Sequence, residues 1–242
     1  MKQLSGIEAV IFDKDGTLLD FDLFWVKVSR KAIEEVLVSF DAKKDLLFSV
    51  LEGLGVRNGI TDINGALCKG TYEEIGEIVY KILIENGCKV LRESVIETVV
   101  RSYHENINAG EIKPTCNNLV EVLKTLKRQN KKLVVVTTDT EQITRECLQK
   151  LGIDDLFEKI YTDDGKLPPK PNPYCALDFC KNYNIKKERV VMVGDTLTDV
   201  SFAKNTGIAA IGFAKSEKNK AILKAHTDMV ISDMSQLLEL LK

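Results

Sequence analysis

Residues 9 to 20 read AVIFDKDGTLLD, a short apolar run that leads into the acidic residues Asp13, Asp15 and Asp20. The apolar run has the length and character of a buried strand. Carboxylates as close together in the sequence as Asp13 and Asp15 repel each other unless a positive charge lies beside them. The stretch therefore predicts a buried strand that ends in an acidic site, which a cation would stabilise.

The overall composition restricts the class of protein. The chain of 242 residues is long enough to bury a sizeable core, and its 34 Lys and Arg against 36 Asp and Glu are interspersed. This balance gives no electrostatic reason to expect nucleic acid or an anionic membrane as a partner. Short apolar runs, scattered cysteines and the lack of a signal-peptide pattern predict a cytoplasmic protein. No pattern specifies an oligomeric state.

The available side chains also restrict the metal that the protein would use. The chain has two histidines and dispersed cysteines, so it offers few of the nitrogen and sulfur ligands that a zinc site usually has. Oxygen ligands favour Mg²⁺. We therefore expect any bound metal ion to be Mg²⁺, held by oxygen atoms.

From about residue 113 onward, short apolar runs alternate with helical patterns. The expected strands lie at 133–137, 159–161, 190–194, 208–213 and 229–231. Strands that alternate with helices at this spacing predict a parallel sheet covered by helices on both faces. The expected fold class is therefore α/β, with a Rossmann-like core.

The stretch 21–110 differs, because helical patterns replace the strand-like runs. Apolar residues recur at helical spacing in 24–40, 71–87 and 90–107, and we expect no strand between them. The sequence thus predicts a helical domain at 21–110, inserted after the first strand of a core formed by 1–20 and 111–242.

Polar residues follow several expected strands at their carboxyl ends. Asp13 follows the first strand, Thr137 and Thr138 follow the apolar run LVVV, and Asp195 follows VVMVG. Open parallel sheets bind ligands at this edge. Three strands would therefore deliver oxygen atoms to one place.

Each of these residues also has a simpler interpretation when it is taken alone. DxDG occurs in calcium loops, but here the further acids and the flanking helices of an EF-hand are missing, which leaves a solvated turn. Asp195 and Asp199 in GDTLTD fit a helix N-cap, and Lys170 in LPPKPNP fits an exposed loop lysine. Asp139, three residues before Gln142, fits a helix start. The order of the four stretches together favours a common site.

That order, with DKDGT, VVVTT, the lysine before PNP and then GDTLTD, resembles the four motifs of the haloacid dehalogenase superfamily. The resemblance covers the whole expected core, and the insertion at 21–110 is similar to the helical cap of phosphoglycolate phosphatase-like and β-phosphoglucomutase-like members. It implies a Mg²⁺-dependent phosphatase that hydrolyses a small-molecule phosphomonoester through an aspartyl-phosphate. A phosphomutase of the β-phosphoglucomutase type and a non-catalytic phosphate-ester sensor are the alternatives.

The resemblance also implies roles for the matching residues. Asp13 resembles the nucleophile, and Asp15 resembles the acid and base that serves the leaving alcohol and then water. Lys170 looks like the cation that offsets charge on the nucleophile and the phosphoryl group. The hydroxyl of Thr137 looks like a phosphate ligand, and Gly16 would let the backbone turn tightly against the phosphate.

The resemblance also implies a set of metal ligands, and one residue departs from the family pattern. The implied metal ligands are Asp13, the backbone carbonyl of Asp15 and Asp195, with Asp199 at or beside the ion. Thr138 is a further candidate for phosphate binding. It stands where the family often has Asn, so a shorter hydroxyl replaces an amide.

Overall fold

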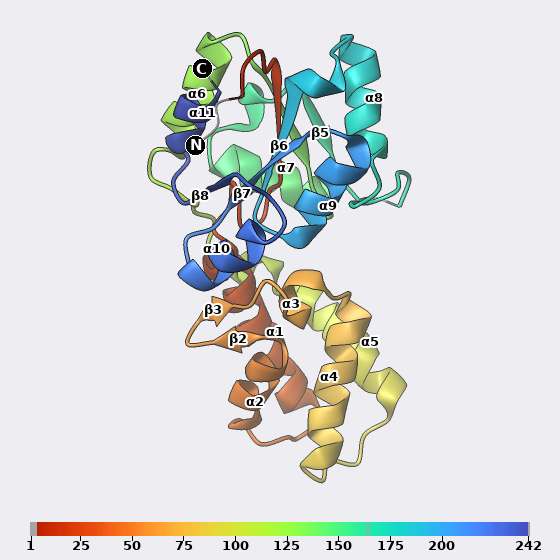
Figure 1. Ribbon diagram of the computed structural model, residues 1–242. Coiled ribbons are helices and arrows are strands. Elements are labelled where there is room, and N and C mark those ends of the chain that lie inside the picture. The colour runs from red at the N-terminus through yellow and green to blue at the C-terminus, as the bar shows by residue number, and fades with distance from the viewer. Residues whose placement is uncertain (1–3, 164, 242) are drawn as a thin grey trace. The chain divides into compact units, whose positions relative to one another are not determined.

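A computed structural model describes residues 4–163 and 165–241 of the chain. The chain forms two compact units, one of Met1–Asp20 with Ile112–Lys242 and the other of Phe21–Glu111 (Figure 1). None of the helices in the described ranges has the length and apolar character that crossing a membrane requires.

The first unit contains a parallel sheet, as the sequence predicts. Within the described residues the sheet has six strands in the order β5-β4-β1-β6-β7-β8, and every ladder is parallel. The strands are β1 (Ala9–Phe12), β4 (Lys132–Val136), β5 (Lys159–Tyr161), β6 (Val190–Gly194), β7 (Ala209–Phe213) and β8 (Val230–Ile231). The expected strands agree with these within one residue at each end, and the α/β fold class is confirmed.

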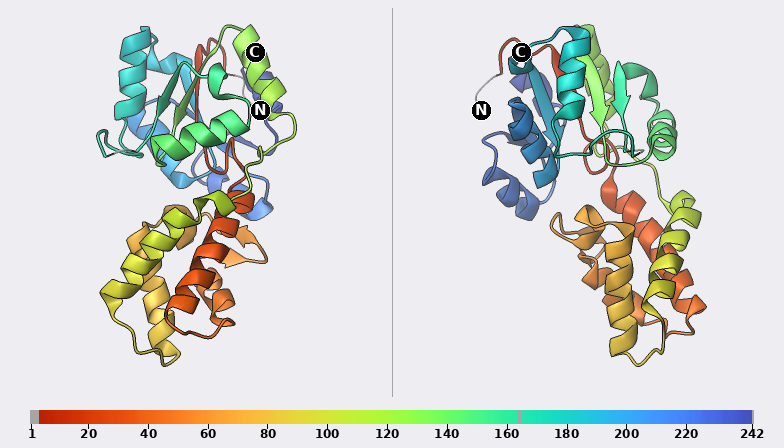
Figure 2. Two further views of the ribbon diagram at one scale, coloured as in Figure 1. Left: turned by 180° about the vertical axis from the view of Figure 1, so that it is seen from behind. Right: turned by 90° about the vertical axis from the view of Figure 1, so that its right-hand side faces the viewer.

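Helices cover both faces of this sheet (Figures 1 and 2). Side chains alternate along β1, so Val10 and Phe12 pack into one apolar cluster while Ala9 and Ile11 pack into another. The first cluster includes residues of α6 (Leu119–Arg128), α7 (Glu141–Lys150) and α11 (Gln236–Leu240). The second includes residues of α8 (Tyr174–Tyr183) and α9 (Leu197–Thr206). The elements α10 (Glu217–Lys224), η3 (Asp154–Leu156) and η4 (Lys187–Arg189) complete this unit.

The order of the strands reverses beside β1. The chain runs from β1 to β4 and β5 on one side, and β6, β7 and β8 follow on the other side. Ligands of open α/β sheets bind at such a switch point, outside the carboxyl ends of the strands. Asp13, the residue after β1, therefore stands at the position where this fold favours a site.

The second unit is built mainly from helices, and the three expected helical segments are confirmed. The elements are η1 (Asp22–Val26), α1 (Lys27–Ser39), α2 (Leu46–Gly53), α3 (Ala66–Lys69), α4 (Tyr72–Glu85), α5 (Arg92–Glu105) and η2 (Ile107–Ala109). The helices α4 and α5 approach closely at Gly76, where an added Cβ would lie 3.0 Å from the Cα of Ile96.

The expectation of no strand in this unit is wrong. A two-stranded antiparallel hairpin joins β2 (Val56–Arg57) to β3 (Ile60–Thr61). Asn58 and Gly59 form its turn with φ values of 52° and 75°, the left-handed conformation that a tight hairpin turn requires and that the Asn-Gly pair adopts readily. Thr61 donates both its N–H and its hydroxyl to Asp22 Oδ1, so the hairpin is fixed to η1.

We predict that Gly76→Val destabilises the helical unit. The added methyl groups would meet the backbone of α5, and overpacking of this kind costs about 1–3 kcal/mol. Urea unfolding followed by circular dichroism measures the loss. Lys81→Val, at an exposed position of the same helix, is the matched control and should cost only the smaller helix propensity of valine. Equal losses for the two variants would contradict the prediction.

Candidate active site

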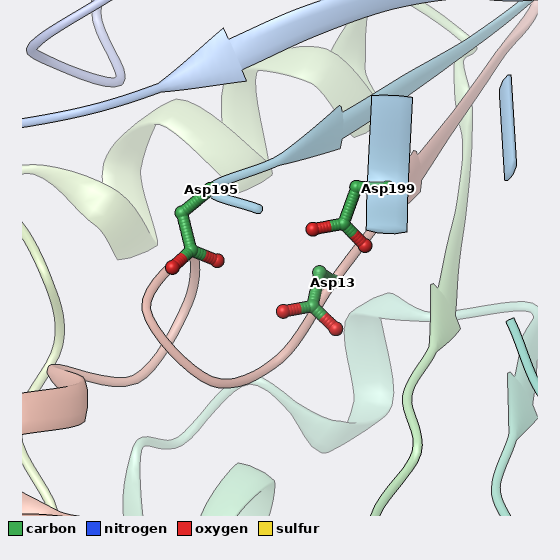
Figure 3. A group of neighbouring side chains, drawn as sticks. All are labelled: Asp13, Asp195 and Asp199. Carbon is green, nitrogen blue, oxygen red and sulfur yellow. The ribbon is translucent and has the colours of Figure 1, made fainter. Parts of the chain in front are cut away.

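Three acidic side chains converge at the carboxyl end of the central strands (Figure 3). Asp13 follows β1, Asp195 follows β6, and Asp199 lies in the first turn of α9. One carboxylate oxygen from each lies within 4.8 Å of the other two. Oxygen atoms in this arrangement match the ligands that hard divalent cations such as Mg²⁺ prefer. The cluster could therefore hold a metal ion.

Lys170 joins two of these carboxylates, although it comes from the loop before α8. Its Nζ lies 2.5 Å from Asp13 Oδ1 and 2.6 Å from Asp199 Oδ1. The side chain is only 4% exposed, so the interpretation as an exposed loop lysine is wrong. Burial alone would lower the pKa of Lys170, but the carboxylates of Asp13 and Asp199 raise it above its ordinary value, and the side chain is therefore a permanent cation.

Asp199 also belongs to the capping structure of α9. Thr196 is the N-cap, and it donates its N–H and its hydroxyl to Asp199 Oδ2 at 3.1 Å and 2.6 Å. The Thr196 hydroxyl in turn accepts the N–H of Asp199. The two oxygens of Asp199 thus contact Thr196 and Lys170, so this carboxylate orients the lysine from a rigid helix end.

The turn after β1 brings the backbone close to Asp195. Gly16 has φ of +80°, and an added Cβ there would lie 2.1 Å from Asp195 Oδ2. Thr17 is fully buried and donates its hydroxyl to Asp195 Oδ1 at 3.1 Å, while its own carbonyl accepts the hydroxyl of Thr115. The glycine thus allows the turn to approach the carboxylate that the threonine holds.

Burial disfavours the charged form of the acidic cluster. Burial raises the pKa of Asp13 to about 7; Lys170 opposes this rise, and the carboxylates of Asp199 and Asp15 add to it. Burial also raises the pKa of Asp195 well above its ordinary value, and Asp13 and Asp199 contribute to that rise. A bound divalent cation would favour the ionised carboxylates and reverse these shifts.

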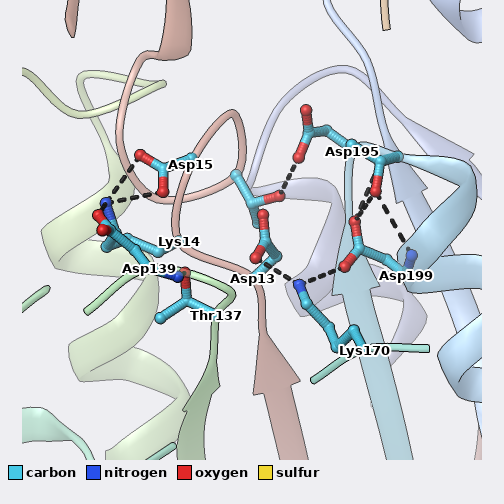
Figure 4. Close-up of polar contacts among 10 residues, drawn as sticks. Asp13, Lys14, Asp15, Thr137, Asp139, Lys170, Asp195 and Asp199 are labelled. Atoms are coloured by element: carbon cyan, nitrogen blue, oxygen red, sulfur yellow. Dashed lines mark hydrogen bonds and ion pairs between the residues drawn. The ribbon is translucent and has the colours of Figure 1, made fainter. Parts of the chain in front are cut away.

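Asp15 belongs to a second, adjoining group of charges (Figure 4). The strand geometry ends at Phe12, and the carboxylate of Asp15 is directed to the Nζ of Lys14, which lies 2.7 Å from each of its oxygens. Lys14 Nζ also lies 3.0 Å from Asp139 Oδ2. The positive charge that the acidic sequence requires therefore comes partly from the residue between the two acids.

The two threonines after β4 differ in their surroundings. Thr137 is 5% exposed, and its hydroxyl accepts the N–H of Asp139 at 3.2 Å. Thr138 is exposed, and the contacts that join the acidic cluster do not include it. The structure therefore brings Asp13, Lys170, Asp195 and Asp199 together, with Asp15 and Thr137 beside them and Thr138 at the surface.

The sequence pattern did not predict a role for Lys14, and it indicated Asp139 as the residue that starts a helix. The helix α7 begins at Glu141 with Thr140 as its N-cap, so Asp139 is not the capping residue. Asp139 instead contacts Lys14. The available signal was the lysine itself, because a charged residue two positions after a buried strand needs a partner when its side chain points inward.

Comparison with known proteins identifies relatives over the whole chain. A family model described as haloacid dehalogenase-like hydrolase matches residues 7–207. A phosphoglycolate phosphatase of Haemophilus influenzae is 30% identical, over 95% of this chain and 96% of the relative. A glyceraldehyde 3-phosphate phosphatase of Pyrococcus furiosus is 34% identical, over 98% of this chain and 93% of the relative.

A similar fold is found among solved structures. A protein of Haemophilus somnus assigned as a phosphoglycolate phosphatase superposes with a TM-score of 0.72. The two chains are 21% identical, and the match covers 97% of each. At this identity the likeness concerns the fold alone.

We predict that Gly16→Ala lowers the affinity for a divalent cation at least tenfold, because the new methyl group would displace the Asp195 carboxylate. Titration with Mn²⁺ followed by electron paramagnetic resonance measures the affinity. Gly6→Ala is the matched control, since Gly6 has φ of +74° and open space around it. Both variants carry the cost of a left-handed alanine, about 1 kcal/mol. The prediction fails if Gly16→Ala binds Mn²⁺ like the control.

We also predict that Mg²⁺ raises the melting temperature more at pH 8 than at pH 5. A carboxyl whose pKa rises on folding, here to about 7 for Asp13 from an ordinary value of about 4, makes the folded protein less stable as pH increases through this interval. Bound Mg²⁺ removes this loss, because it replaces the protons. Thermal scans with Mg²⁺ and with EDTA at both pH values measure the difference. Equal gains at the two pH values would refute the competition between protons and Mg²⁺.

Proposed function

Because the chain belongs to the haloacid dehalogenase-like hydrolases, we propose that it is a Mg²⁺-dependent phosphatase of a small phosphomonoester. The observation that carries the proposal is the contact of one buried lysine with two of three clustered carboxylates, at the switch point of the sheet. The proposal includes a cytoplasmic location and the role of residues 21–110 as a cap domain.

The donor set fits a magnesium ion. Asp13 and Asp195 would hold it with carboxylate oxygens and Asp15 with its backbone carbonyl, while Asp199 would stay beside the ion or contribute an oxygen. When bound, the ion would offset the negative charge of the phosphoryl group and the attacking carboxylate. The raised pKa values of Asp13 and Asp195 support this assignment, since two buried carboxyls of this kind are stable in ionised form only beside added positive charge.

Asp13 would act as the nucleophile. Its carboxylate oxygen would form a bond to phosphorus as the bond from phosphorus to the leaving alcohol breaks, which gives an aspartyl-phosphate. Lys170, which contacts Asp13 Oδ1 at 2.5 Å, would reduce the repulsion between the carboxylate and the phosphate dianion. Asp199 would hold the lysine in place through its contact at 2.6 Å.

Asp15 would move the protons. It would give a proton to the leaving alcohol, and its carboxylate would then accept a proton from the water that attacks the aspartyl-phosphate. This second step forms a bond from water oxygen to phosphorus and breaks the bond from phosphorus to Asp13. The side chain of Asp15 is 17% exposed, which leaves it accessible to an incoming group.

The phosphate ligands would come from the turn after β1 and the end of β4. We assign the hydroxyl of Thr137, the backbone at Gly16 and the ammonium of Lys170 to the phosphoryl oxygens. Thr138 would contribute its hydroxyl from the exposed side. Phosphoglycolate and glyceraldehyde 3-phosphate, the substrates in the names of the two relatives, are small anionic phosphomonoesters, and we propose a substrate of this class.

We predict that the purified protein releases phosphate from a panel of phosphomonoesters, including phosphoglycolate, glyceraldehyde 3-phosphate and hexose phosphates. Activity should require Mg²⁺ and fall at least about a thousandfold in Asp13→Asn, which lacks the nucleophile. Asp155→Asn, which alters an exposed carboxylate on η3, is the matched control.

The products separate the alternatives. Free phosphate supports the phosphatase, and an isomerised hexose phosphate without free phosphate supports the phosphomutase. Binding of a phosphate ester without turnover supports the sensor. The phosphatase proposal is wrong if no member of the panel releases phosphate in the presence of Mg²⁺.

A further inference from the structure

Lys14 is a fully buried lysine that the steps above do not use. It lies between Asp13 and Asp15 in the sequence, and its side chain is 0% exposed. Its Nζ lies 2.7 Å from both oxygens of Asp15 and 3.0 Å from Asp139 Oδ2 (Figure 4). Burial of an ammonium group is costly unless partners compensate it, so a side chain in this place needs both contacts.

Asp139 is the fixed end of this group of charges. Its Oδ1 accepts the N–H of Thr140 at 2.8 Å, its own N–H donates to the hydroxyl of Thr137, and its carbonyl accepts the N–H of Asp163. Thr140 is the N-cap of α7, so these bonds tie Asp139 to the start of a helix. Lys14 is therefore anchored on one side to rigid backbone.

Asp15 is the more exposed end of the same group. Its side chain is 17% exposed, against 10% for Asp139 and 0% for Lys14. A carboxylate with both oxygens on one ammonium has a defined orientation, whereas a carboxylate in a solvated turn samples several. Through its contacts with Asp139 and Asp15, Lys14 thus fixes the carboxylate of Asp15 relative to the start of α7.

We propose that Lys14 is a positioning residue that sets the orientation of Asp15 for proton transfer, with Asp139 as its anchor. This role rests on the proposed phosphatase function. Two partners for one lysine suit such a role, because Asp139 holds the ammonium in place from the start of α7 while the same ammonium contacts both oxygens of Asp15.

The variant Lys14→Met tests the proposal when its rates are measured with substrates whose leaving groups differ in acidity. The nitrophenolate of p-nitrophenyl phosphate departs without a proton, so the first turnover should stay within about threefold of the wild-type rate. Hydrolysis of the aspartyl-phosphate needs Asp15, so the following steady rate should fall at least tenfold, which gives a burst of one equivalent of nitrophenolate. With an alkyl phosphate, formation of the aspartyl-phosphate itself should slow at least tenfold, with KM within about threefold.

A second variant separates the effect of Lys14 on the orientation of Asp15 from its effect on the stability of the fold. Lys14→Met leaves the carboxylates of Asp15 and Asp139 together without their cation, which destabilises the fold. The double variant Lys14→Met with Asp139→Asn restores the wild-type net charge of the group, so its melting temperature should recover while its turnover stays low. Lys127→Met, which removes a half-buried lysine paired with Glu158 before β5, is the control for loss of a lysine and should keep wild-type kinetics.

The outcomes are distinguishable. Turnover that recovers together with stability in the double variant shows a structural role and overturns the proposal. Equal losses in the first turnover and in the steady rate of Lys14→Met overturn it as well, as does wild-type behaviour of that variant. If the wild-type protein itself releases no phosphate, the proposed function fails and the positioning role fails with it; in every other case the phosphatase proposal stands independently.

Discussion

The structure depends on how the fold compensates the negative charge that it gathers at the end of β1. The buried side chains of Asp13 and Asp199 and the half-buried side chain of Asp195 lie close together. The ammonium group of Lys170 contacts two of them, Asp13 and Asp199. Three ionised carboxylates against one ammonium leave two negative charges, the amount that one divalent cation neutralises. Burial is the main cause of the raised pKa values of Asp13 and Asp195, and repulsion from the neighbouring carboxylates adds to both. The acidic cluster of the folded chain could therefore hold one divalent cation.

The parallel arrangement of the strands makes this concentration of charge possible. Because all ladders are parallel, the residues after β1 and β6 meet at one edge, and the β1–β6 register places Phe12 opposite Val193. Two glycines then remove the steric obstacles. An added Cβ on Gly16 would meet the Asp195 carboxylate, and one on Gly194 would lie 2.3 Å from the Cβ of Asp199. The carboxylates can approach one another only where the backbone lacks side chains of its own.

Local patterns predict the strands well. The strands β1, β4 and β6 are the clearest cases, because each is a run of mostly buried residues that is followed by a polar residue at its end. The hairpin at β2 and β3 was missed since its strands are two residues each, although Asn58 and Gly59 carried the turn signal. The contact of Lys14 with Asp139 was not predictable from spacing, because it depends on which strand lies beside β1. Local spacing instead favoured a capping role for Asp139. Lys170 could be assigned only by resemblance, as its loop has no periodicity.

The two lysines explain how neighbouring aspartates can take different roles in the proposed reaction. If the side chains of Asp13 and Asp15 both bound the metal, Asp15 would be held as a ligand and would have no freedom to exchange protons. Lys14 instead directs the carboxylate of Asp15 to Asp139 and α7, while Lys170 holds Asp13 beside Asp199 and α9. Each acid is thus tied to a different helix by its own cation. The separation of nucleophile from proton carrier follows from this division of the positive charge, and it needs no difference between the two carboxyl groups themselves.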